Sequence, residues 1–460
     1  MNRAIIVTDL GYGDAGKGSM VDFLARQAKS ALVVRYNGGP QAAHNVITPD
    51  GRHHTFAQFG SGSFVPGTRT HLSRFMLVNP FNLVREQEHL EGLGVFGLWD
   101  LLTIDAEALV ITPWHVAANR IRELVRGDGR HGSCGQGIGE TRFDSLHFPE
   151  EVIRVRDLLN PVILRRKLAW VQNLKQIQLA EIIPLLPNTE HTRRELQILQ
   201  NAELVDTCVD FYSRFAELVT VVEAEKLNEL MAGAELTLFE GAQAVLLDQD
   251  YGFHPYTTWS VTTQENALTL LTEAEYDGEL TRLGVIRGYM VRHGPGPFVS
   301  EDDRLSKAVP DYHNGMNAWQ QGFRVGHLDF VVLRYALEAN LGVDELAVTN
   351  LDRMAAISGW QTVGAYELSE RHRTSPYLTG VSDGIATGIR IGPKNRRDYQ
   401  EAITNVLLAS KPVLRPVAIG NLSKVAGIEA YLGLITQELA LPVTYTSYGP
   451  TALEKKHLGS

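Results

Sequence analysis

The sequence predicts an α/β protein with a large central sheet, mostly parallel, that helices flank. Two observations lead to this prediction. Apolar runs typical of strands alternate with segments of helical periodicity at both ends of the chain, and a glycine-rich turn follows the first run. Hydrophobic residues make up 44% and charged residues 21% of the 460 residues, which is typical of a globular protein with a large core.

The first 34 residues favour a strand, a loop, a helix and a second strand, in that order. Residues 4–7 are mostly β-branched or aliphatic, and residues 11–18 are rich in glycine. Residues 20–26 place apolar side chains at helical spacing, and residues 31–34 form another apolar run. A strand–helix–strand unit of this kind implies a parallel sheet.

The same alternation returns near the end of the chain, so both ends are expected to contribute strands to one sheet. The expected elements there are helices at 328–341 and 425–439 and strands at 345–349 and 443–446. Residues 150–235 predict a helical excursion, and glycine-rich short strands and turns, which form smaller β subregions, follow it. No linker composition interrupts the sequence, so we expect a single domain over residues 1–460.

Charge and composition exclude several classes of protein. The net charge of −10 argues against nucleic acid or an anionic membrane as a main partner. No apolar run is long enough for a membrane span, and the first apolar run is too brief for a signal peptide. The two cysteines, Cys134 and Cys208, fit a reducing compartment, so we expect a cytoplasmic protein.

Residues 11–19, Gly-Tyr-Gly-Asp-Ala-Gly-Lys-Gly-Ser, form the strongest local signal. They nearly match the phosphate-binding P-loop, in which backbone amides and a lysine, here Lys17, bind phosphate. Gly18, however, stands where a P-loop needs a hydroxyl. Asp14 places a carboxylate in an anion-binding loop, which is costly unless that carboxylate binds a cation or handles a proton. An ordinary glycine-rich turn is the alternative interpretation.

Two further segments carry candidate side chains. His44 follows the second strand, and strand ends next to a phosphate loop face one crevice, so His44 could meet a nucleotide held by Lys17. Gln243 follows another apolar strand and suits the edge of a heterocycle, while Thr258 offers a hydroxyl to phosphate. The alternatives are a structural histidine at residue 44 and a turn-capping role for the neighbouring Glu240.

Taken in order, these segments resemble the adenylosuccinate synthetase family, whose members join aspartate to inosine monophosphate with GTP. The resemblance extends through most of the chain. Its segments are residues 13–18 (GDAGKG), 38–46 (GGPQAAHNV), 137–139 (GIG), 239–243 (FEGAQ), 292–298 (RHGPGPF, where the family has RVGAGPF), 324–329 (RVGHLD), 349–352 (TNLD) and 447–450 (SYGP).

The resemblance implies a site and a reaction. Asp14 would take the proton from purine N1 and contact Mg²⁺, and His44 would support charge on the departing phosphate. The other implied contacts are Gly13, Gly16, Lys17, Gly18, Arg324, Asn350, Asp352, Ser447 and Gly449 for the triphosphate nucleotide, Gln41, Ser133, Cys134, Gln243 and Thr258 for the purine monophosphate, and the carbonyl of Ala43 for magnesium. GTP or another triphosphate, aspartate or another amine, and a homodimer complete the implied partners.

Departures from the family pattern concern the pockets that select substrates. The family receives the aspartate carboxylates in a loop rich in threonine and arginine, but residues 317–323 read Asn-Ala-Trp-Gln-Gln-Gly-Phe, with Gly322 at the cationic position. Asn350 replaces a lysine that flanks guanine. Phe148 takes the place of an arginine that crosses the family's dimer, and Arg142 or Arg154 could compensate.

Three hypotheses remain open at this stage. The chain is a ligase of the family's type, with the family's amine and purine or with different ones; or it is a nucleotide-binding regulator that has lost ligation; or it is a P-loop phosphotransferase. Asp14 argues against a simple guanylate-directed ligase, because relatives that make modified purine deoxynucleotides carry serine at this place.

Overall fold

A computed structural model describes residues 2–129, 132–310, 322–356, 359–417 and 425–459. Ten strands form the central sheet, in the order β22-β21-β15-β11-β1-β10-β2-β5-β7-β9, and each pairing is parallel except that of β21 with β22. Their bounds are β1 Arg3–Asp9, β2 Ala31–Arg35, β5 Arg69–Leu72, β7 Leu102–Asp105, β9 Thr220–Val222, β10 Leu236–Glu240, β11 Glu279–Arg287, β15 Glu345–Thr349, β21 Val443–Ser447 and β22 Lys455–His457. The predicted α/β class and mostly parallel sheet are confirmed.

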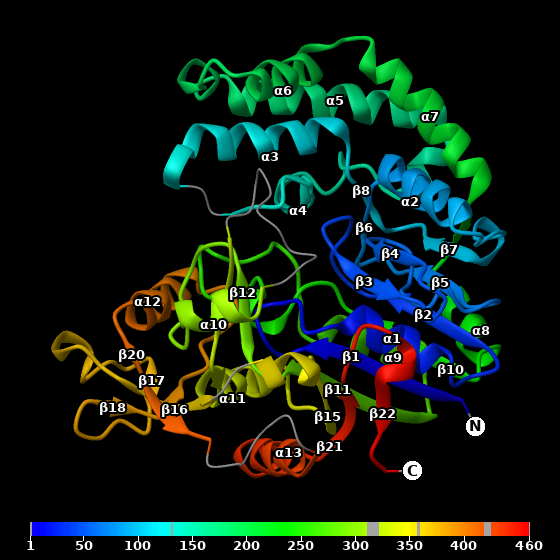
Figure 1. Cartoon of the computed structure of the whole chain (residues 1–460). Helices are drawn as coiled ribbons and strands as arrows, with labels where there is room; N and C mark the ends of the chain where they lie inside the picture. The colour runs from blue at the N-terminus through cyan, green and yellow to red at the C-terminus, as the bar shows by residue number, and fades with distance from the viewer. Residues whose placement is uncertain (1, 130–131, 311–321, 357–358, 418–424, 460) are drawn as a thin grey trace.

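Strands from both ends of the chain belong to this sheet, with β1 in its middle and β21 and β22 at one edge. β1 pairs with β10 on one side and with β11 on the other, and β15 and β21 extend the sheet beyond β11. The central strands are buried on both faces, as a parallel sheet covered by helices requires. Figure 1 shows both chain termini beside this sheet.

Helices form a layer at one end of the molecule, at the top of Figure 1. The helices of this region are α2 Pro80–Gly92, α3 Pro113–Arg126, α4 Ile138–His147, α5 Pro161–Leu179, α6 Glu190–Gln200 and α7 Leu204–Leu218. The predicted helical stretch thus contains α5, α6 and α7. It also contains β9 and the whole of α8 (Lys226–Ala232), so the chain returns to the sheet edge before the stretch ends.

A smaller mixed sheet lies at the opposite end, at the lower left of Figure 1. It joins β14 Leu328–Asp329, β16 Gln361–Glu367, β18 Ile385–Ala386 and β20 Lys411–Pro416. The helix expected over residues 328–341 is shorter in the structure, where α11 spans Phe330–Ala339. The Asp329 carboxylate caps α11 by accepting the backbone N–H groups of Val331 and Val332, so the two preceding residues are free to form β14.

The remaining elements connect these layers. They are α1 Lys17–Ala25, β3 His44–Ile47, β4 His53–Phe56, β6 Leu77–Val78, β8 Leu109–Val110, α9 Glu265–Glu273, β12 Met290–His293, α10 Asp303–Ala308, β13 Phe323–Gly326, β17 Leu378–Thr379, β19 Gly388–Ile389, α12 Arg397–Leu408, α13 Val425–Leu439 and the 3₁₀ turns η1 Trp99–Leu101, η2 Gly127–Gly129, η3 Val155–Leu159, η4 Ile183–Leu185, η5 Val245–Leu247, η6 Leu351–Ala356, η7 Glu370–His372 and η8 Ala452–Glu454. Within the described ranges, no helix has the length and apolar character that crossing a bilayer requires.

Candidate active site

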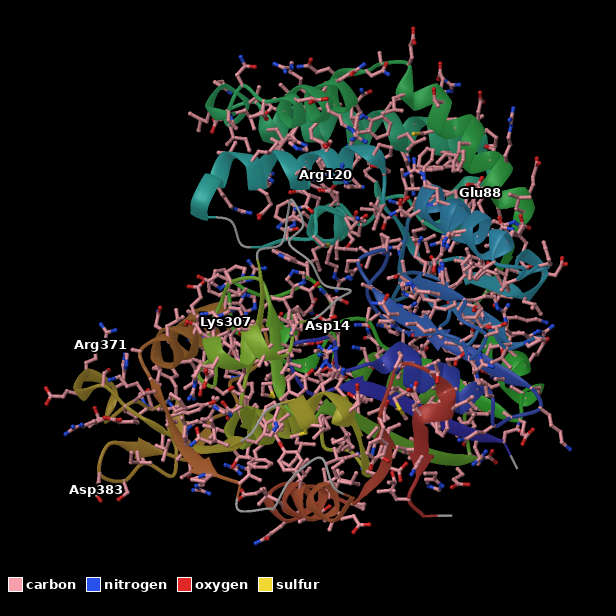
Figure 2. All side chains as sticks on the ribbon, viewed as in Figure 1. Asp14, Glu88, Arg120, Lys307, Arg371 and Asp383 are labelled. Atoms are coloured by element: carbon pink, nitrogen blue, oxygen red, sulfur yellow. The ribbon has the colours of Figure 1, made fainter. Side chains whose placement is uncertain are left out.

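A cleft of about 420 Å³ lies where the central strands β1, β2, β10 and β15 end. Figure 2 shows Asp14 near the centre of the molecule, whereas Arg371 and Asp383 lie at its periphery. The sequence-predicted residues that line the cleft are Gly13, Asp14, Gly16, Lys17, Gly18, Gln41, Ala43, His44, Gln243, Asn350, Asp352, Ser447 and Gly449. The fold therefore brings residues from both ends of the chain to one cavity.

Asp9, the last residue of β1, holds the glycine-rich loop of residues 11–19 in place. Its buried carboxylate accepts the backbone N–H groups of Gly11 and Ala15, at 2.9 and 3.0 Å, and pairs with Lys17 Nζ at 3.2 Å. Lys17 Nζ also donates to the carbonyl of Gln243, at 2.6 Å. These contacts fix the lysine at the floor of the cleft. Asp9 was not among the predicted site residues, although its place between an apolar strand and a glycine loop was a usable signal.

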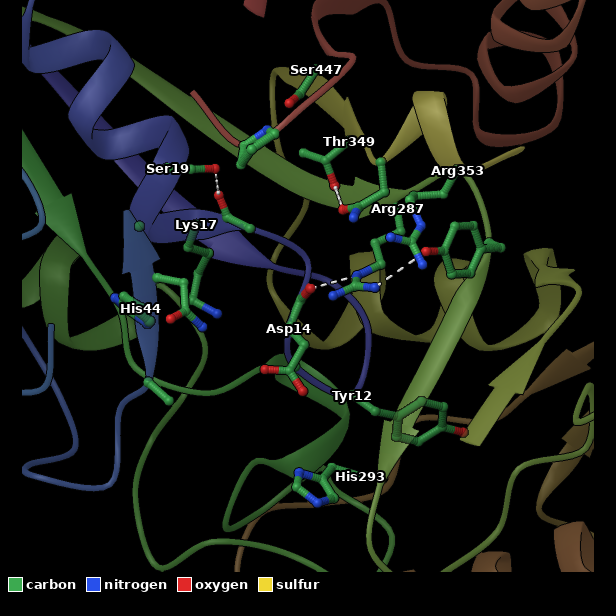
Figure 3. A pocket seen from close by; sticks show the side chains of 18 of the residues that line it. Tyr12, Asp14, Lys17, Ser19, His44, Arg287, His293, Thr349, Arg353 and Ser447 are labelled. Atoms are coloured by element: carbon green, nitrogen blue, oxygen red, sulfur yellow. Dashed lines mark hydrogen bonds between the residues drawn. The ribbon is translucent and has the colours of Figure 1, made fainter. Parts of the chain in front are cut away.

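Asp14 occupies the turn of this loop with its side chain toward the open cleft (Figure 3). Its backbone lies in the left-handed region, with φ of 59°, which aspartate tolerates better than most residues. Arg287 Nε donates to the Asp14 carbonyl at 2.5 Å and so ties the turn to the end of β11. Gly16, with φ of 90°, is the N-cap residue of α1.

His44 lies against the buried carboxylate of Glu240, a residue for which turn capping was one alternative interpretation of the sequence. His44 Nδ1 lies 2.5 Å from Glu240 Oε1, and the backbone N–H and the hydroxyl of Ser61 donate to the same carboxylate. Arg35 Nε lies 4.0 Å from Glu240 Oε2. Burial opposes ionisation of Glu240, but the charges of Arg35 and His44 and the hydrogen bonds lower its pKa to about 2.

The ionised Glu240 fixes the histidine tautomer. A carboxylate accepts only, so Nδ1 carries a proton and Nε2 is the atom left to meet a ligand. Nε2 is buried and has no hydrogen-bond partner within the described part of the chain. Burial lowers the pKa of His44 despite the opposing charge of Glu240. Phosphate oxygens bound nearby would favour its protonated form.

Close packing explains why Gly18 replaces the P-loop hydroxyl. A Cβ atom at residue 18 would lie 2.5 Å from the Cβ of His44 and 2.9 Å from the Ser61 hydroxyl. Real side chains do not approach this closely, so only glycine lets the first turn of α1 pass the strand β3 that carries His44. The position of His44 therefore requires that residue 18 has no side chain, and hence no hydroxyl.

The far end of the cleft is formed by residues from η6 and the loop after β21. Asp352 lies on η6, and its burial raises the pKa of its carboxyl group. Ser447 ends β21, and the loop that follows it and carries Gly449 is held by Lys455, whose Nζ donates to the carbonyls of residues 449, 450 and 451 at 3.4, 3.3 and 3.0 Å. Burial lowers the pKa of Lys455 to about 8, against the charges of nearby carboxylates. Sequence reasoning did not identify this lysine.

Four predicted contacts do not line the cleft. Arg324 pairs with Glu301 at 2.7 Å and donates to the carbonyls of Gly294 and Gly296. Ser133 donates to Asn119 Oδ1, burial raises the pKa of the Cys134 thiol to about 11, and Thr258 donates its backbone N–H to Leu247. Their roles toward a nucleotide stay predictions. Phe148, Arg142 and Arg154 also lie outside the cleft wall.

The donors in the cleft fit a magnesium ion that arrives with phosphates. Mg²⁺ is usually bound by one or two carboxylates together with substrate phosphates and water. In the described ranges, no group of three or more His, Cys, Asp or Glu side chains could hold a metal alone. Asp14 and Ala43 both line the cleft, so one carboxylate and one backbone segment that could contribute to such a site face the same cavity.

Comparisons with known proteins identify the family of this chain. A family model described as adenylosuccinate synthetase matches residues 6–454. The adenylosuccinate synthetase of Chlorobium chlorochromatii (strain CaD3) is 30% identical over 458 residues, covering 97% of this chain and 95% of the relative. That of Mycobacterium leprae (strain TN) is 30% identical over 371 residues, covering 80% and 81%.

Solved structures share the fold at lower identity. The fully ligated adenylosuccinate synthetase of Plasmodium falciparum matches with a TM-score of 0.75 and 19% identity, over 98% of both chains. The succinoaminodeoxyadenylate synthetase of cyanophage S-2L, bound to dGMP and to dATP as an energy donor, matches with a TM-score of 0.59 and 14% identity, over 99% of this chain and 95% of that chain.

Proposed function

This chain belongs to the adenylosuccinate synthetase family, and we propose that it is a ligase that joins an amine to C6 of a 6-oxopurine nucleoside monophosphate, driven by GTP or another nucleoside triphosphate. The observation that carries the proposal is the meeting of Asp14, Lys17 and His44 on one cleft. A proton acceptor, a phosphate-binding cation and a histidine fixed by Glu240 are the three groups that the reaction needs.

The first step is phosphoryl transfer to the purine. Asp14 takes the proton from N1, so negative charge moves to the 6-oxygen. That oxygen attacks the γ-phosphorus, a new O6–P bond forms, and the bond between γ-phosphorus and the bridging oxygen breaks to release the diphosphate. Lys17 holds phosphate charge at the floor of the cleft, and His44 Nε2 donates to phosphate oxygens as the charge shifts.

The second step forms the carbon–nitrogen bond. The amine nitrogen attacks C6, the C6–O bond breaks, inorganic phosphate leaves with the original 6-oxygen, and the amine loses a proton. His44 again stabilises the departing phosphate. Asp14 and Ala43 would hold Mg²⁺, which when bound neutralises charge on the triphosphate. The rest of the catalysis is positioning of the reacting groups. Asp9 positions Lys17, Glu240 positions His44, and Arg287 positions the turn at Asp14.

A second candidate is a paralogue that uses a different amine, and the sequence of residues 317–322 favours it. This stretch lacks the threonines and the cation that receive aspartate in the family pattern. The nucleotide-binding regulator is disfavoured because a chain without ligation has no use for a carboxylate inside a phosphate loop.

Product analysis tests the proposal. The purified protein is incubated with Mg²⁺ and a matrix of purine monophosphates, triphosphates and amines, and products are identified by mass spectrometry. We expect a 6-amino-substituted nucleotide and one phosphate per turnover. Asp14→Ala should abolish the adduct, while circular dichroism and thermal unfolding stay close to wild type because the side chain faces the cleft. Turnover retained in that variant would remove Asp14 from the mechanism.

A further inference from the structure

A second histidine, His293, lies on the wall of the cleft at the end of β12. It lines the same cavity as Asp14, Lys17 and His44. β12 pairs with β13 in antiparallel register, so His293 lies opposite Phe323, and the two ring centroids are 6.2 Å apart at an angle of 70°. Figure 3 shows the imidazole across the open space from the Asp14 carboxylate. The strand pairing therefore fixes an imidazole on the wall that faces Asp14.

The Nε2 atom of His293 is available to a bound molecule. It is buried and has no hydrogen-bond partner among the residues that the structure describes. Leaving a buried polar atom unpaired is costly, and a substrate group that bonds to it removes that cost. A neutral imidazole with its proton on Nδ1 accepts at Nε2. The family segment RVGAGPF has valine at this place, so the imidazole is a feature of this chain.

The second step of the proposed reaction has a proton to place. An α-amino group is largely protonated near neutral pH, and an ammonium nitrogen has no lone pair with which to attack C6. Asp14 has already taken the proton of purine N1 in the first step. His44 is the donor to the departing phosphate. A different acceptor close to C6 would make the amine nucleophilic inside the cleft.

The geometry of the purine places the amine near His293. N1 and C6 are neighbouring ring atoms, so a purine whose N1 meets Asp14 presents C6 beside the same carboxylate. Figure 3 shows the side chains of Tyr12, Arg287 and His293 around Asp14. Burial raises the pKa of the Tyr12 hydroxyl, and a guanidinium has no acceptor atom. Among these three described neighbours, the imidazole is the group that accepts a proton near neutral pH.

We propose that His293 is a catalytic residue that accepts a proton from the amine substrate. Nε2 takes one proton from the ammonium group, and the nitrogen regains its lone pair. That lone pair forms the bond to C6, while the C6–O bond breaks and its electron pair leaves with the phosphate. The nitrogen then loses a second proton to water. This inference rests on the proposed function and adds the group that activates the amine.

Amines that differ in protonation test the proposal. Near neutral pH the nitrogens of aspartate and of ammonium chloride are largely protonated, whereas hydroxylamine is largely neutral. With IMP, GTP and Mg²⁺, His293→Val should lower kcat/KM about 100-fold for the protonated amines that wild type accepts, the size of a general-base contribution, but at most about threefold for hydroxylamine. An equal loss for both kinds of amine, or no loss, would overturn the inference. A wild-type enzyme that forms no adduct with any of the three would also overturn it.

Two further variants separate proton transfer from hydrogen bonding and from folding. His293→Gln keeps a polar side chain that accepts no proton near neutral pH, so it should lose as much activity with protonated amines as His293→Val. Wild-type rates in His293→Gln would show that residue 293 only forms a hydrogen bond and would overturn the inference. His372→Val, which changes a histidine of η7 outside the cleft, is the matched control and should keep wild-type rates with every amine. Valine suits a strand position, so thermal unfolding of His293→Val should stay close to wild type.

Positional isotope exchange separates this inference from the proposed function. A triphosphate labelled with ¹⁸O at its β,γ-bridge scrambles that label when phosphoryl transfer to IMP is reversible, and no amine is needed. His293→Val should scramble the label as fast as wild type, because His293 acts after phosphoryl transfer. Scrambling in wild type together with failure of the amine pattern, or scrambling lost in His293→Val alone, would overturn the inference and leave the proposed function. No scrambling in wild type would overturn both.

Discussion

His44 Nδ1 lies 2.5 Å from Glu240 Oε1, so a histidine that faces the cleft is oriented by a carboxylate at the end of a different strand. The carboxylate is held in turn by Ser61 and lies near Arg35. Glu240 is therefore a positioning residue. It keeps a proton on Nδ1 and, in the proposed reaction, leaves Nε2 for the departing phosphate.

Glu240→Gln should lower kcat about 100-fold, the size of a typical general-acid contribution, with little change in KM for either nucleotide. The neutral amide no longer fixes the tautomer of His44 or stabilises its protonated form. Steady-state kinetics measures the split between kcat and KM. Ser61→Ala, which removes a hydroxyl bond to the same carboxylate, is the control and should lower kcat much less. A Glu240→Gln enzyme with wild-type kcat would show that the pair is only structural.

The same variant should lose stability in a pH-dependent way. Replacing Glu240 leaves Arg35 buried without a full charge partner, which costs about 3 kcal/mol near neutral pH. The pKa of Glu240 is about 2, below its ordinary 4.5, so the stabilisation is present above pH 4.5 and is lost as pH falls toward 2. The difference in unfolding free energy between wild type and Glu240→Gln, from denaturant titrations, should narrow over this interval. A constant difference would contradict the assigned ionisation.

Gly18→Ser should not restore a P-loop enzyme. The added Cβ would meet His44 at 2.5 Å, so we expect a loss of about 1–3 kcal/mol in stability and a lower kcat. Thermal unfolding and turnover measure both. Gly92→Ser, at the end of α2 with no atom within 4 Å of the new Cβ, is the control and should unfold close to wild type. Unchanged stability in Gly18→Ser would refute the close approach of α1 and β3.

Asp352→Asn should weaken selection of the triphosphate base. A carboxylate accepts hydrogen bonds from the N1–H and the amino group of guanine, and adenine offers no N1–H. We expect KM for GTP to rise about 10- to 100-fold, the range for a lost charged hydrogen bond, while KM for ATP stays constant. Asp383→Asn, at the periphery in Figure 2, should change neither. Equal effects on both triphosphates would place Asp352 away from the base.

Lys455 should make triphosphate binding sensitive to alkaline pH. Its ammonium holds three carbonyls of the loop after β21, and its pKa is about 8. Below pH 8 the Lys455 side chain keeps its extra proton and donates these hydrogen bonds. Above pH 8 it loses that proton and part of the hydrogen bonding. KM for the triphosphate should therefore rise between pH 7 and pH 9 in wild type. Lys455→Met should show a high KM that is flat over this range. A wild-type profile as flat as the variant's would contradict this role.

Site residues that lie close together along the chain could be predicted from the sequence more readily than residues that meet only when the chain folds. The glycine loop with Asp14 and Lys17 lies within nine residues, so its turn chemistry and strand context are visible along the chain. Glu240 lies 196 residues from His44, and its role depends on the order β1-β10-β2 in the sheet. Strand order is a tertiary property, so the histidine–carboxylate pair could not be read from either segment alone.

The predicted start of the helix at residue 328 was wrong, because a capping side chain overrides the apolar periodicity. The apolar pattern from residue 328 continues through Asp329, but that carboxylate caps the helix and delays its start to Phe330. Lys455 was not predicted as a site residue, for a different reason. It sits near a charged tail, where a lysine is usually solvated, and only the return of β22 against β21 buries it.

Transfer of the purine oxygen tests the central claim most directly. IMP labelled with ¹⁸O at the 6-position is incubated with the protein, a triphosphate, Mg²⁺ and an accepted amine, and the phosphate released is analysed by mass spectrometry. Attack by the 6-oxygen, which Asp14 initiates, predicts one ¹⁸O atom in each phosphate and an unlabelled nucleotide adduct. Unlabelled phosphate would mean that water receives the phosphoryl group, and the ligase mechanism would be wrong.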